Sequence, residues 1–218
     1  MAIAFDAYTF MSAVDPSTTH TPAADPRAVL LLVTHLTAEV PTATYGGSSL
    51  TSIATEGSTG GELTTQSVTA FFKDGVSSGV QTIAVDSGAG GCNVHVFSLT
   101  ASTTAVFVNS VSMESNAIAN PSTTLTLSGQ TAFVAESWLS GQNSTTGTAP
   151  LAGWTNRQAT DAGTQIHGCY SYDTIGSVDV TVGATQASED WLMLAVAIAE
   201  ASAGGGGVRL WRRSLLGV

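Results

Sequence analysis

The chain has few charged residues, and basic residues are the scarcest. Only 10% of its 218 residues are Asp, Glu, Lys or Arg, where a quarter is usual. All 16 acidic residues but only three of the six basic ones lie in residues 1–203, which gives this part a formal charge of −13. Nucleic acid would repel so acidic a body, so we expect no nucleic-acid partner. Disordered acidic chains have low hydrophobicity, whereas 43% of this chain is hydrophobic.

Cysteines, targeting segments and long apolar runs are also scarce. The two cysteines, Cys92 and Cys169, are too few for a disulfide framework. The opening residues MAIAFDAYTF contain neither the basic nor the apolar region of a signal peptide. The apolar run Ala28–Val33 is too short to span a bilayer. The sequence therefore predicts a protein that is made and assembled in the cytoplasm and has no membrane partner.

What the sequence does contain is a series of short strands, of which one hairpin is the clearest. The stretch Thr42–Ile53, TATYGGSSLTSI, fits strand, turn and strand. Gly46 and Gly47 permit the positive φ angles that a tight type I′ turn requires, and Tyr45 and Ser48 flank them. This hairpin is expected to stand among about fourteen strands with similar punctuation.

The rest of the chain predicts strands rather than helices. The apolar run Ala28–Leu36 fits a buried central strand, and Asp15–Pro26, with three prolines, predicts a loop. The closing run Trp191–Ile198 contains good helix formers, but a strand agrees better with what precedes it. Further strands are expected at Ile3–Met11, Ser67–Phe72, Val80–Val85, Asn93–Leu99, Thr104–Ser112, Thr131–Leu139, Gly153–Ala159, Gln165–Tyr172 and Ser177–Val182. Such regular spacing with Gly, Ser and Asn punctuation predicts a sandwich or barrel.

The order of these motifs resembles a known family. An IAFDA strand, an LLLV strand, the TATYGGSSLTSI hairpin, VHVFSL, SGQTAFVAESW, a GWT strand and DWLMLAVAI follow one another across residues 2–200. In this order they resemble the Ser/Thr/Gly-rich jelly-roll domains of tailed-phage virion proteins, which also occur in some bacterial surface proteins. The resemblance implies an all-β, jelly-roll-type antiparallel two-sheet β-sandwich with a structural or adhesive role. It brings no catalytic residues.

One set of side chains has the composition of a zinc site: Cys92, His95, His167 and Cys169. Zinc requires four such ligands that converge as a tetrahedron. Cys92 and His95 are three residues apart and face opposite sides of an extended strand unless a bulge intervenes. We therefore expect two buried cysteines and two hydrogen-bonded histidines, with no metal and no cofactor.

Other catalytic or ion-binding patterns are weaker. A Ser-His-Asp triad is always available in a serine-rich chain, but the G-x-S-x-G elbow is missing. The adjacent pair Glu189 and Asp190 does not converge on one face of a strand. Loop acids of the kind that bind calcium are expected to be solvated instead; they are Asp161, Asp173 and Asp179. The sequence therefore predicts a protein that is not an enzyme.

Aromatic residues offer one alternative function. Trp138, Trp154, Tyr170 and Tyr172 are able to form a platform on which sugar rings stack, with Trp138 and Trp154 as its main members. Core packing and cross-strand pairing are the more common use of such residues. The alternative is a carbohydrate-binding or adhesion module.

The C-terminal end differs from the rest of the chain. Residues 204–207 are four glycines, which form a flexible linker. The arm that follows combines three basic residues with a Trp and several aliphatic residues, the types that dominate binding interfaces. We expect this arm to bind a partner through Arg209, Leu210, Trp211, Arg212, Arg213, Leu215 and Leu216.

These observations predict two parts, a sandwich domain over residues 1–203 and a linker with its arm over residues 204–218. The leading hypothesis is a non-enzymatic structural protein of a tailed-phage virion, either a capsid decoration (cement) protein or a tail or fibre component. Its expected partners are the major capsid or tail proteins and further copies of itself. A homo-oligomer is expected, and such assemblies are often trimers.

Overall fold

The structure is a computed structural model that describes residues 2–37, 40–63, 65–88, 90–141, 148–162, 165–176 and 178–201. Within these residues the chain forms seventeen β-strands and one short 3-10 helix at Gly61–Leu63. The expected all-β class is confirmed, and the strands form antiparallel sheets as in a sandwich. In the described residues, no helix is long and apolar enough to cross a bilayer. Residues 204–218, the predicted linker and arm, lie outside the described residues.

The first half of the chain forms two sheets. The five strands of inner sheet 1 are, in spatial order, β1 (Ala4–Val14), β9 (Gly91–Thr100), β3 (Ala28–His35), β7 (Ser67–Asp74) and β6 (Thr51–Gly57). The four strands of outer sheet 1 are β2 (Ser17–His20), β8 (Gln81–Asp86), β4 (Thr42–Tyr45) and β5 (Ser48–Ser49).

The second half forms two more sheets. Inner sheet 2 consists of β10 (Ala105–Ile118), β17 (Glu189–Glu200), β12 (Ala132–Ser140), β15 (Gln165–Ile175) and β14 (Thr155–Ala162). Outer sheet 2 consists of β11 (Ser122–Leu125), β16 (Val180–Thr185) and β13 (Ala149–Pro150).

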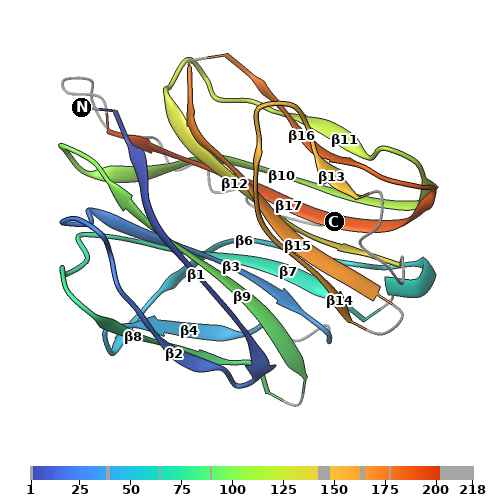
Figure 1. The fold of residues 1–218 in the computed structure, drawn as a ribbon, viewed down its shortest axis with the longest axis horizontal. Helices are drawn as coiled ribbons and strands as arrows, with labels where there is room; N and C mark the ends of the chain where they lie inside the picture. The colour runs from blue at the N-terminus through green and yellow to red at the C-terminus, as the bar shows by residue number, and fades with distance from the viewer. Residues whose placement is uncertain are drawn as a thin grey trace, which may run out of the picture.

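The four sheets lie in layers, with the two inner sheets in the middle (Figure 1). Three apolar cores fill the spaces between adjacent sheets. The inner core joins the two inner sheets through residues such as Leu30 and Phe133. The first outer core, which includes Leu31, lies between inner sheet 1 and outer sheet 1, and the second, which includes Trp138 and Trp191, lies between the sheets of the second half. The expected two-sheet arrangement is therefore too simple, because the central strands are buried on both faces.

The two halves repeat the same arrangement of strands. Inner sheet 1 has the order β1-β9-β3-β7-β6, and inner sheet 2 has the corresponding order β10-β17-β12-β15-β14. The outer sheets correspond as well, since β2-β8-β4 matches β11-β16-β13. Irregularities recur at matching places: the register shifts between Phe5 and Ala7 in β1 and between Phe107 and Asn109 in β10. It also shifts in both β6 and β14.

A short sequence repeat marks the same duplication. The segment Pro-Ser-Thr-Thr occurs at residues 16–19 and again at residues 121–124. Ser17 pairs with Ala84, and Ser122 pairs with Gly183 in the same register. In each half the proline carbonyl oxygen accepts a backbone hydrogen bond of 3.0 Å, from Val85 in the first half and Ala184 in the second. Two copies of one sandwich unit therefore make up the body.

The predicted hairpin is confirmed at its turn. Tyr45 pairs with Ser48, and Gly46 and Gly47 have φ angles of 57° and 74°. The returning chain stays in outer sheet 1 for only the two residues of β5 and then crosses to inner sheet 1 as β6. The hairpin therefore connects the two layers of the first half.

Two further expectations concern single segments. The proposed loop Asp15–Pro26 contains a strand, β2. Ser17 and Thr19 of this strand are exposed and all four of its residues are polar, so its composition resembles that of a loop. The closing run Trp191–Ile198 is a strand, as expected, and lies between β10 and β12. Both faces of this strand pack against apolar cores, which explains why apolar and polar residues do not alternate along it.

Candidate functional site

A serine, a histidine and an aspartate do come together in the first half, but in the wrong order for a triad. His20 Nε2 and Ser98 Oγ are 3.0 Å apart, and Ser98 Oγ donates to Asp6 Oδ2 at 2.8 Å. His20 Nδ1 lies 2.8 Å from Thr9 Oγ1. The carboxylate thus binds the serine rather than the imidazole, and Ser98 and His20 are completely buried. Burial lowers the pKa of His20. This network joins β1, β2 and β9 and supports folding rather than nucleophilic catalysis.

The structure separates the four residues of the zinc pattern. Cys92 lies in the first outer core, whereas Cys169 lies in the inner core on a different sheet. His95 is completely buried and lies 2.8 Å, through Nδ1, from the hydroxyl of Tyr8. Burial, with a smaller contribution from His167, lowers the pKa of His95 to about 3. No group of three or more His, Cys, Asp and Glu side chains able to hold a metal occurs in the described part of the chain.

The loop acids have protein partners. Asp173 Oδ1 accepts a 2.5 Å hydrogen bond from Arg157 Nη2, and Asp179 Oδ1 accepts one of 3.1 Å from the backbone of Leu127. Asp190 Oδ1 receives the backbone N–H of Ala117 at 3.1 Å. The side chain of Asp161 lies outside the described residues. The three described carboxylates thus tie strands and loops together.

The aromatic residues proposed for sugar stacking are core residues. Trp138 is completely buried and stacks on Trp191 with ring centroids 4.9 Å apart. Trp154 is 8% exposed and meets Tyr172 edge-on at 5.8 Å. A sugar requires an exposed ring face, and neither tryptophan presents one. These rings are buried because outer sheet 2 covers the face of inner sheet 2 that carries Trp138.

Glu136 is completely buried in β12, although no motif in the sequence points to it. Its Oε2 accepts the backbone N–H of Gly183 at 2.8 Å, and burial raises its pKa well above the usual range. The second outer core also contains buried polar atoms that have no partner among the described residues: Glu136 Oε1, Trp138 Nε1, Tyr170 OH and Trp191 Nε1. The raised pKa favours the protonated carboxyl group, whose O–H is able to donate a hydrogen bond. The only sign of this buried carboxyl group in the sequence is a glutamate inside the apolar run TAFVAESWL.

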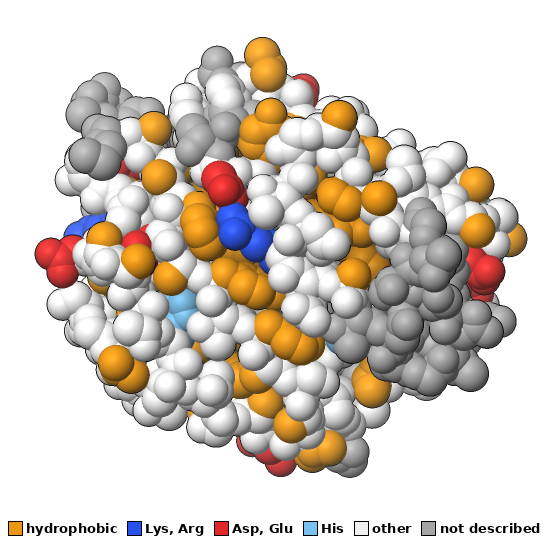
Figure 2. All heavy atoms as spheres, viewed as in Figure 1, with side chains coloured by type: hydrophobic (Ala, Val, Ile, Leu, Met, Phe, Trp, Pro, Cys, Tyr) orange, Lys and Arg blue, Asp and Glu red, His pale blue; other side chains and the backbone are white. Residues whose placement is uncertain are grey.

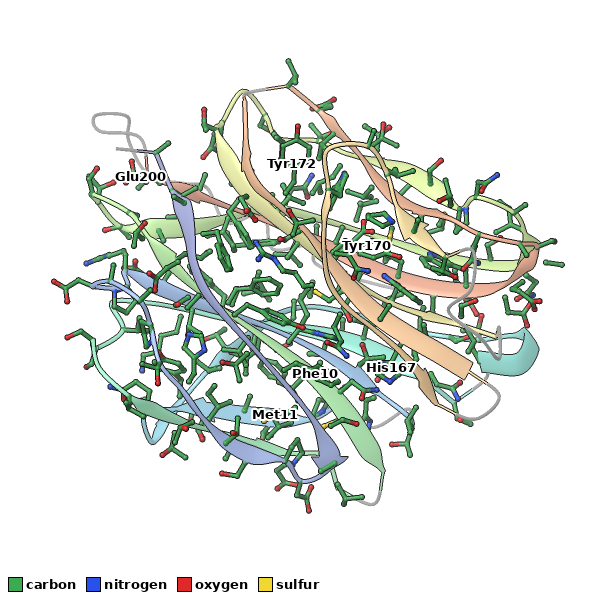
Figure 3. The ribbon with its side chains drawn as sticks, viewed as in Figure 1. Phe10, Met11, His167, Tyr170, Tyr172 and Glu200 are labelled. Carbon is green, nitrogen blue, oxygen red and sulfur yellow. The ribbon has the colours of Figure 1, made fainter. Side chains whose placement is uncertain are left out.

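A surface cavity of about 280 Å³ lies where β1 ends and where β9 and β15 begin. We call it the β1–β9 cavity. Its rim is exposed, with Val14 at 59% and Leu36 at 38%, and its floor is formed by buried residues. Its lining consists of Ser12, Ala13, Val14, Leu36, Gly91, Cys92, Asn93 and His167. His167 lies close to Phe10 of β1, with ring centroids 6.2 Å apart, and Figure 3 labels both residues.

The floor of this cavity contains an unused hydrogen-bond acceptor. Asn93 is 3% exposed, and its Oδ1 has no partner among the described residues. This oxygen is almost completely inaccessible to solvent, and a buried carbonyl oxygen without a donor is costly.

A second cavity, of about 310 Å³, lies on outer sheet 1 and carries negative charge. Val14 of the first cavity is followed directly by Asp15, which lines the second. Asp86 also lines it and is exposed. The two cavities share no lining residue.

Comparisons with known proteins add no relative: no family model, no curated protein and no solved structure matches the chain. The predicted arm residues Arg209, Leu210, Trp211, Arg212, Arg213, Leu215 and Leu216 lie outside the described residues.

Proposed function

We propose that the protein is a non-enzymatic structural component of a tailed-phage virion, a capsid decoration protein first and a tail or fibre component second. One observation carries the proposal, the strand order in each half. One sheet has the order β1-β9-β3-β7 and faces a sheet of order β2-β8-β4-β5. Apart from β6 at the edge of inner sheet 1, this order is the one expected for an eight-stranded jelly roll, a fold common in viral capsid proteins, and it supports the proposal. The second half has the corresponding orders β10-β17-β12-β15-β14 and β11-β16-β13, without a counterpart of β5. In this proposal the body is two jelly rolls in tandem.

The nature of the surface supports a structural role. In Figure 2 few charged side chains are visible, and side chains that are neither charged nor hydrophobic, together with the backbone, make up most of the visible face. The catalytic-type side chains Ser98, His20 and Glu136 are completely buried. A stable body with an uncharged polar surface suits a component that is exposed in many copies.

The arm supplies the attachment in this proposal. Identical bodies with a formal charge of −13 repel one another, and an arm of charge +3 offsets part of this repulsion at a contact. Trp211 and its aliphatic neighbours add burial that salt does not screen. The partners are further copies of the chain, in a homo-oligomer such as a trimer, and the major capsid or tail proteins.

The test compares the full chain with chains that carry Trp211→Ala or end at residue 203. Size-exclusion chromatography with light scattering measures self-association, and electron microscopy of gold-labelled protein measures incorporation into phage particles. We expect both changed chains to stay folded and to lose most of the association and incorporation. Val178→Ala, a change at an exposed residue of the body (70% exposed), serves as the control.

Two results would overturn the proposal. One is that the full chain fails to incorporate into any particle, and the other is that the chain ending at residue 203 incorporates equally well. A glycan array on the full chain adds a third arm. Strong binding to a defined glycan would favour an adhesion module instead.

A further inference from the structure

The three basic residues of the body differ in their partners. Arg27 Nη2 lies 2.5 Å from Asp74 Oδ2, and Arg157 Nη2 lies 2.5 Å from Asp173 Oδ1. Lys73, the only lysine in the sequence, forms neither an ion pair nor a side-chain hydrogen bond in the part of the chain that the structure describes. In a body with 16 acidic residues, this half-buried cation is therefore available to an anion from outside.

Lys73 faces outer sheet 1. Successive residues of a strand point to opposite sides of the sheet, and β7 pairs with β3 without a register shift. Phe71, two residues earlier in β7, packs in the first outer core, so Lys73 lies on the same face. Asp74 lies on the other face, where its Oδ1 accepts the backbone N–H of Ala105 at 2.8 Å. The Lys73 side chain therefore lies at the end of the first outer core, across β7 from the Asp74 carboxylate.

A small polar cavity of about 110 Å³ lies beside Lys73. We call it the Lys73 pocket. Its lining comes from the β4–β5 turn, from the end of β7 with its connection to β8, and from the first residue of β8. The turn contributes Ser48 and the connection contributes Ser77, both exposed serines whose hydroxyls are able to donate. At about 30 Å³ per water molecule, the pocket has room for roughly three or four waters, which suits a small oxyanion.

Backbone hydrogen bonds hold the lining segments in place without a ligand. Gly46 of the turn donates its N–H to the carbonyl oxygen of Thr82 at 2.8 Å, and Gly75 of the connection donates to that of Arg27 at 2.8 Å. The turn and the connection thus have a fixed shape before binding. A preformed site loses less conformational entropy when a ligand binds.

We propose that the Lys73 pocket binds one small oxyanion group, a carboxylate, a sulfate or a phosphate. The lysine ammonium has three donors and no acceptor, so its ligand has to supply acceptors. Hydrogen bonds between an ammonium and an anion are stronger than those between neutral groups, which favours an anion over an uncharged alcohol. The charge of −13 on the body does not prevent this, because charges farther away than about 8 Å are largely screened at physiological ionic strength. This site lies in the body and goes beyond the proposed function, which uses the arm.

Titration of the isotope-labelled full chain, followed by NMR, tests the site directly. The probes are sodium sulfate, sodium phosphate and sodium acetate, each exchanged against sodium chloride at constant ionic strength. NMR is preferable to thermal melting because sulfate stabilises folded proteins in general. We expect saturable shifts of the backbone amide signals of Gly46, Ser48, Gly75 and Ser77. The dissociation constant should lie in the millimolar range, because one partly exposed charge pair is weak.

Changes at Lys73 separate the pocket from the overall charge. Lys73→Met keeps the length of the side chain and removes its charge, so it should weaken binding about tenfold or more. Lys73→Arg should retain most of the binding. Lys73→Met combined with Val178→Lys has the net charge of the natural chain, with its lysine at a residue of the second half that is 70% exposed. This double variant should bind as weakly as Lys73→Met alone, and the dispersion of each NMR spectrum shows whether the variant is folded.

A further probe identifies what carries the anion. Sodium glucuronate presents the carboxylate of acetate on a sugar ring. Binding about tenfold tighter than that of acetate would indicate an acidic sugar, whereas equal binding would show that the pocket recognises the anionic group alone, and either result supports the site. The inference is overturned if no probe shifts the four amide signals, if Lys73→Met binds fully, or if the double variant binds as well as the natural chain. None of these results bears on the proposed function, which is tested by removing the arm.

Discussion

Asp15 and Asn120 hold equivalent positions in the two halves of the chain. Both precede a proline, and both have positive φ angles, 45° and 50°. Asp15 Oδ1 accepts the backbone N–H of Ser87 at 2.7 Å, and Asn120 Oδ1 accepts that of Gln186 at 3.1 Å. Asp and Asn are the residues other than glycine that adopt this backbone conformation most readily. The duplicated unit therefore requires a short polar side chain at this corner.

The first prediction is that removing either side chain destabilises the body, whereas replacing Asp15 with asparagine does not. Asp15→Ala or Asn120→Ala should each lower the free energy of unfolding by about 1–2 kcal/mol, through the lost hydrogen bond and the strained φ. Asp15→Asn should change the free energy of unfolding very little, because an asparagine, Asn120, holds the equivalent position in the second half. Urea unfolding followed by tryptophan fluorescence measures this. Equal effects of Asp15→Asn and Asp15→Ala would contradict it.

A second prediction concerns Gly183, which has a φ of 131°. A Cβ there would overlap the carbonyl oxygen of Pro121 and the Cα of Ser122. Because both obstacles are backbone atoms, Gly183→Ala should cost about 2–3 kcal/mol or more. Ala84 holds the equivalent position in the first half, and Ala84→Gly should cost only about 0.5–1 kcal/mol. Thermal melts of the two variants compare them, and similar losses would show that the halves are not equivalent here.

The third prediction follows from the buried carboxyl of Glu136. Burial raises its pKa in the folded protein, so the folded chain holds a proton that the unfolded chain releases above about pH 4.5. The contribution to stability is therefore present below this pH and is lost as pH rises. Glu136→Gln stays neutral and can still accept the N–H of Gly183. Its melting temperature relative to the natural chain should rise steadily between pH 4 and pH 8.

Glu114 provides a control of the opposite sign. Its carboxylate accepts hydrogen bonds from Ser58, Thr59 and Gly60, and the bond from the Ser58 hydroxyl is the largest cause of its lowered pKa. The contribution of Glu114 to stability is present above the pKa that this residue has in the unfolded chain, and it is lost as pH falls. Glu114→Gln should therefore lose stability at neutral pH relative to the natural chain and approach it in acid. The same direction of change for both variants would refute the assignment of Glu136 as a neutral acid.

The fourth prediction concerns acid unfolding. Burial lowers the pKa of His95 to about 3, so the folded protein leaves it neutral while the unfolded chain takes up a proton below about pH 6.5. Its contribution to stability is present above pH 6.5 and is lost as pH falls toward 3. His95→Leu should make the loss of stability between pH 6.5 and 4 less steep. Tyr8→Phe removes the hydrogen-bond partner but should keep the steepness, and urea unfolding at each pH measures both.

Local patterns in the sequence predicted the strands and the hairpin, because those features depend on neighbouring residues. The Gly46–Gly47 turn follows from the φ angles that glycine permits, and the strand at Ala28–His35 follows from one apolar run. The loop prediction at Asp15–Pro26 was wrong over β2, because polar strand residues on a solvent-facing sheet have the composition of a loop. The repeated Pro-Ser-Thr-Thr was visible in the sequence, but four residues are a weak signal until two identical registers accompany it.

The sequence by itself determined the all-β class, the sparse charge of the body and the contrast between this body and its basic arm, because these depend on composition and on neighbours along the chain. Only the tertiary structure decided that Trp138 is a core residue, that Glu136 is buried against Gly183 and that Asn93 lines a surface cavity. Each of these facts depends on which sheet covers a given strand face. Stacking of sheets brings together residues far apart in the chain, and strands that are apolar on both faces do not specify their neighbours.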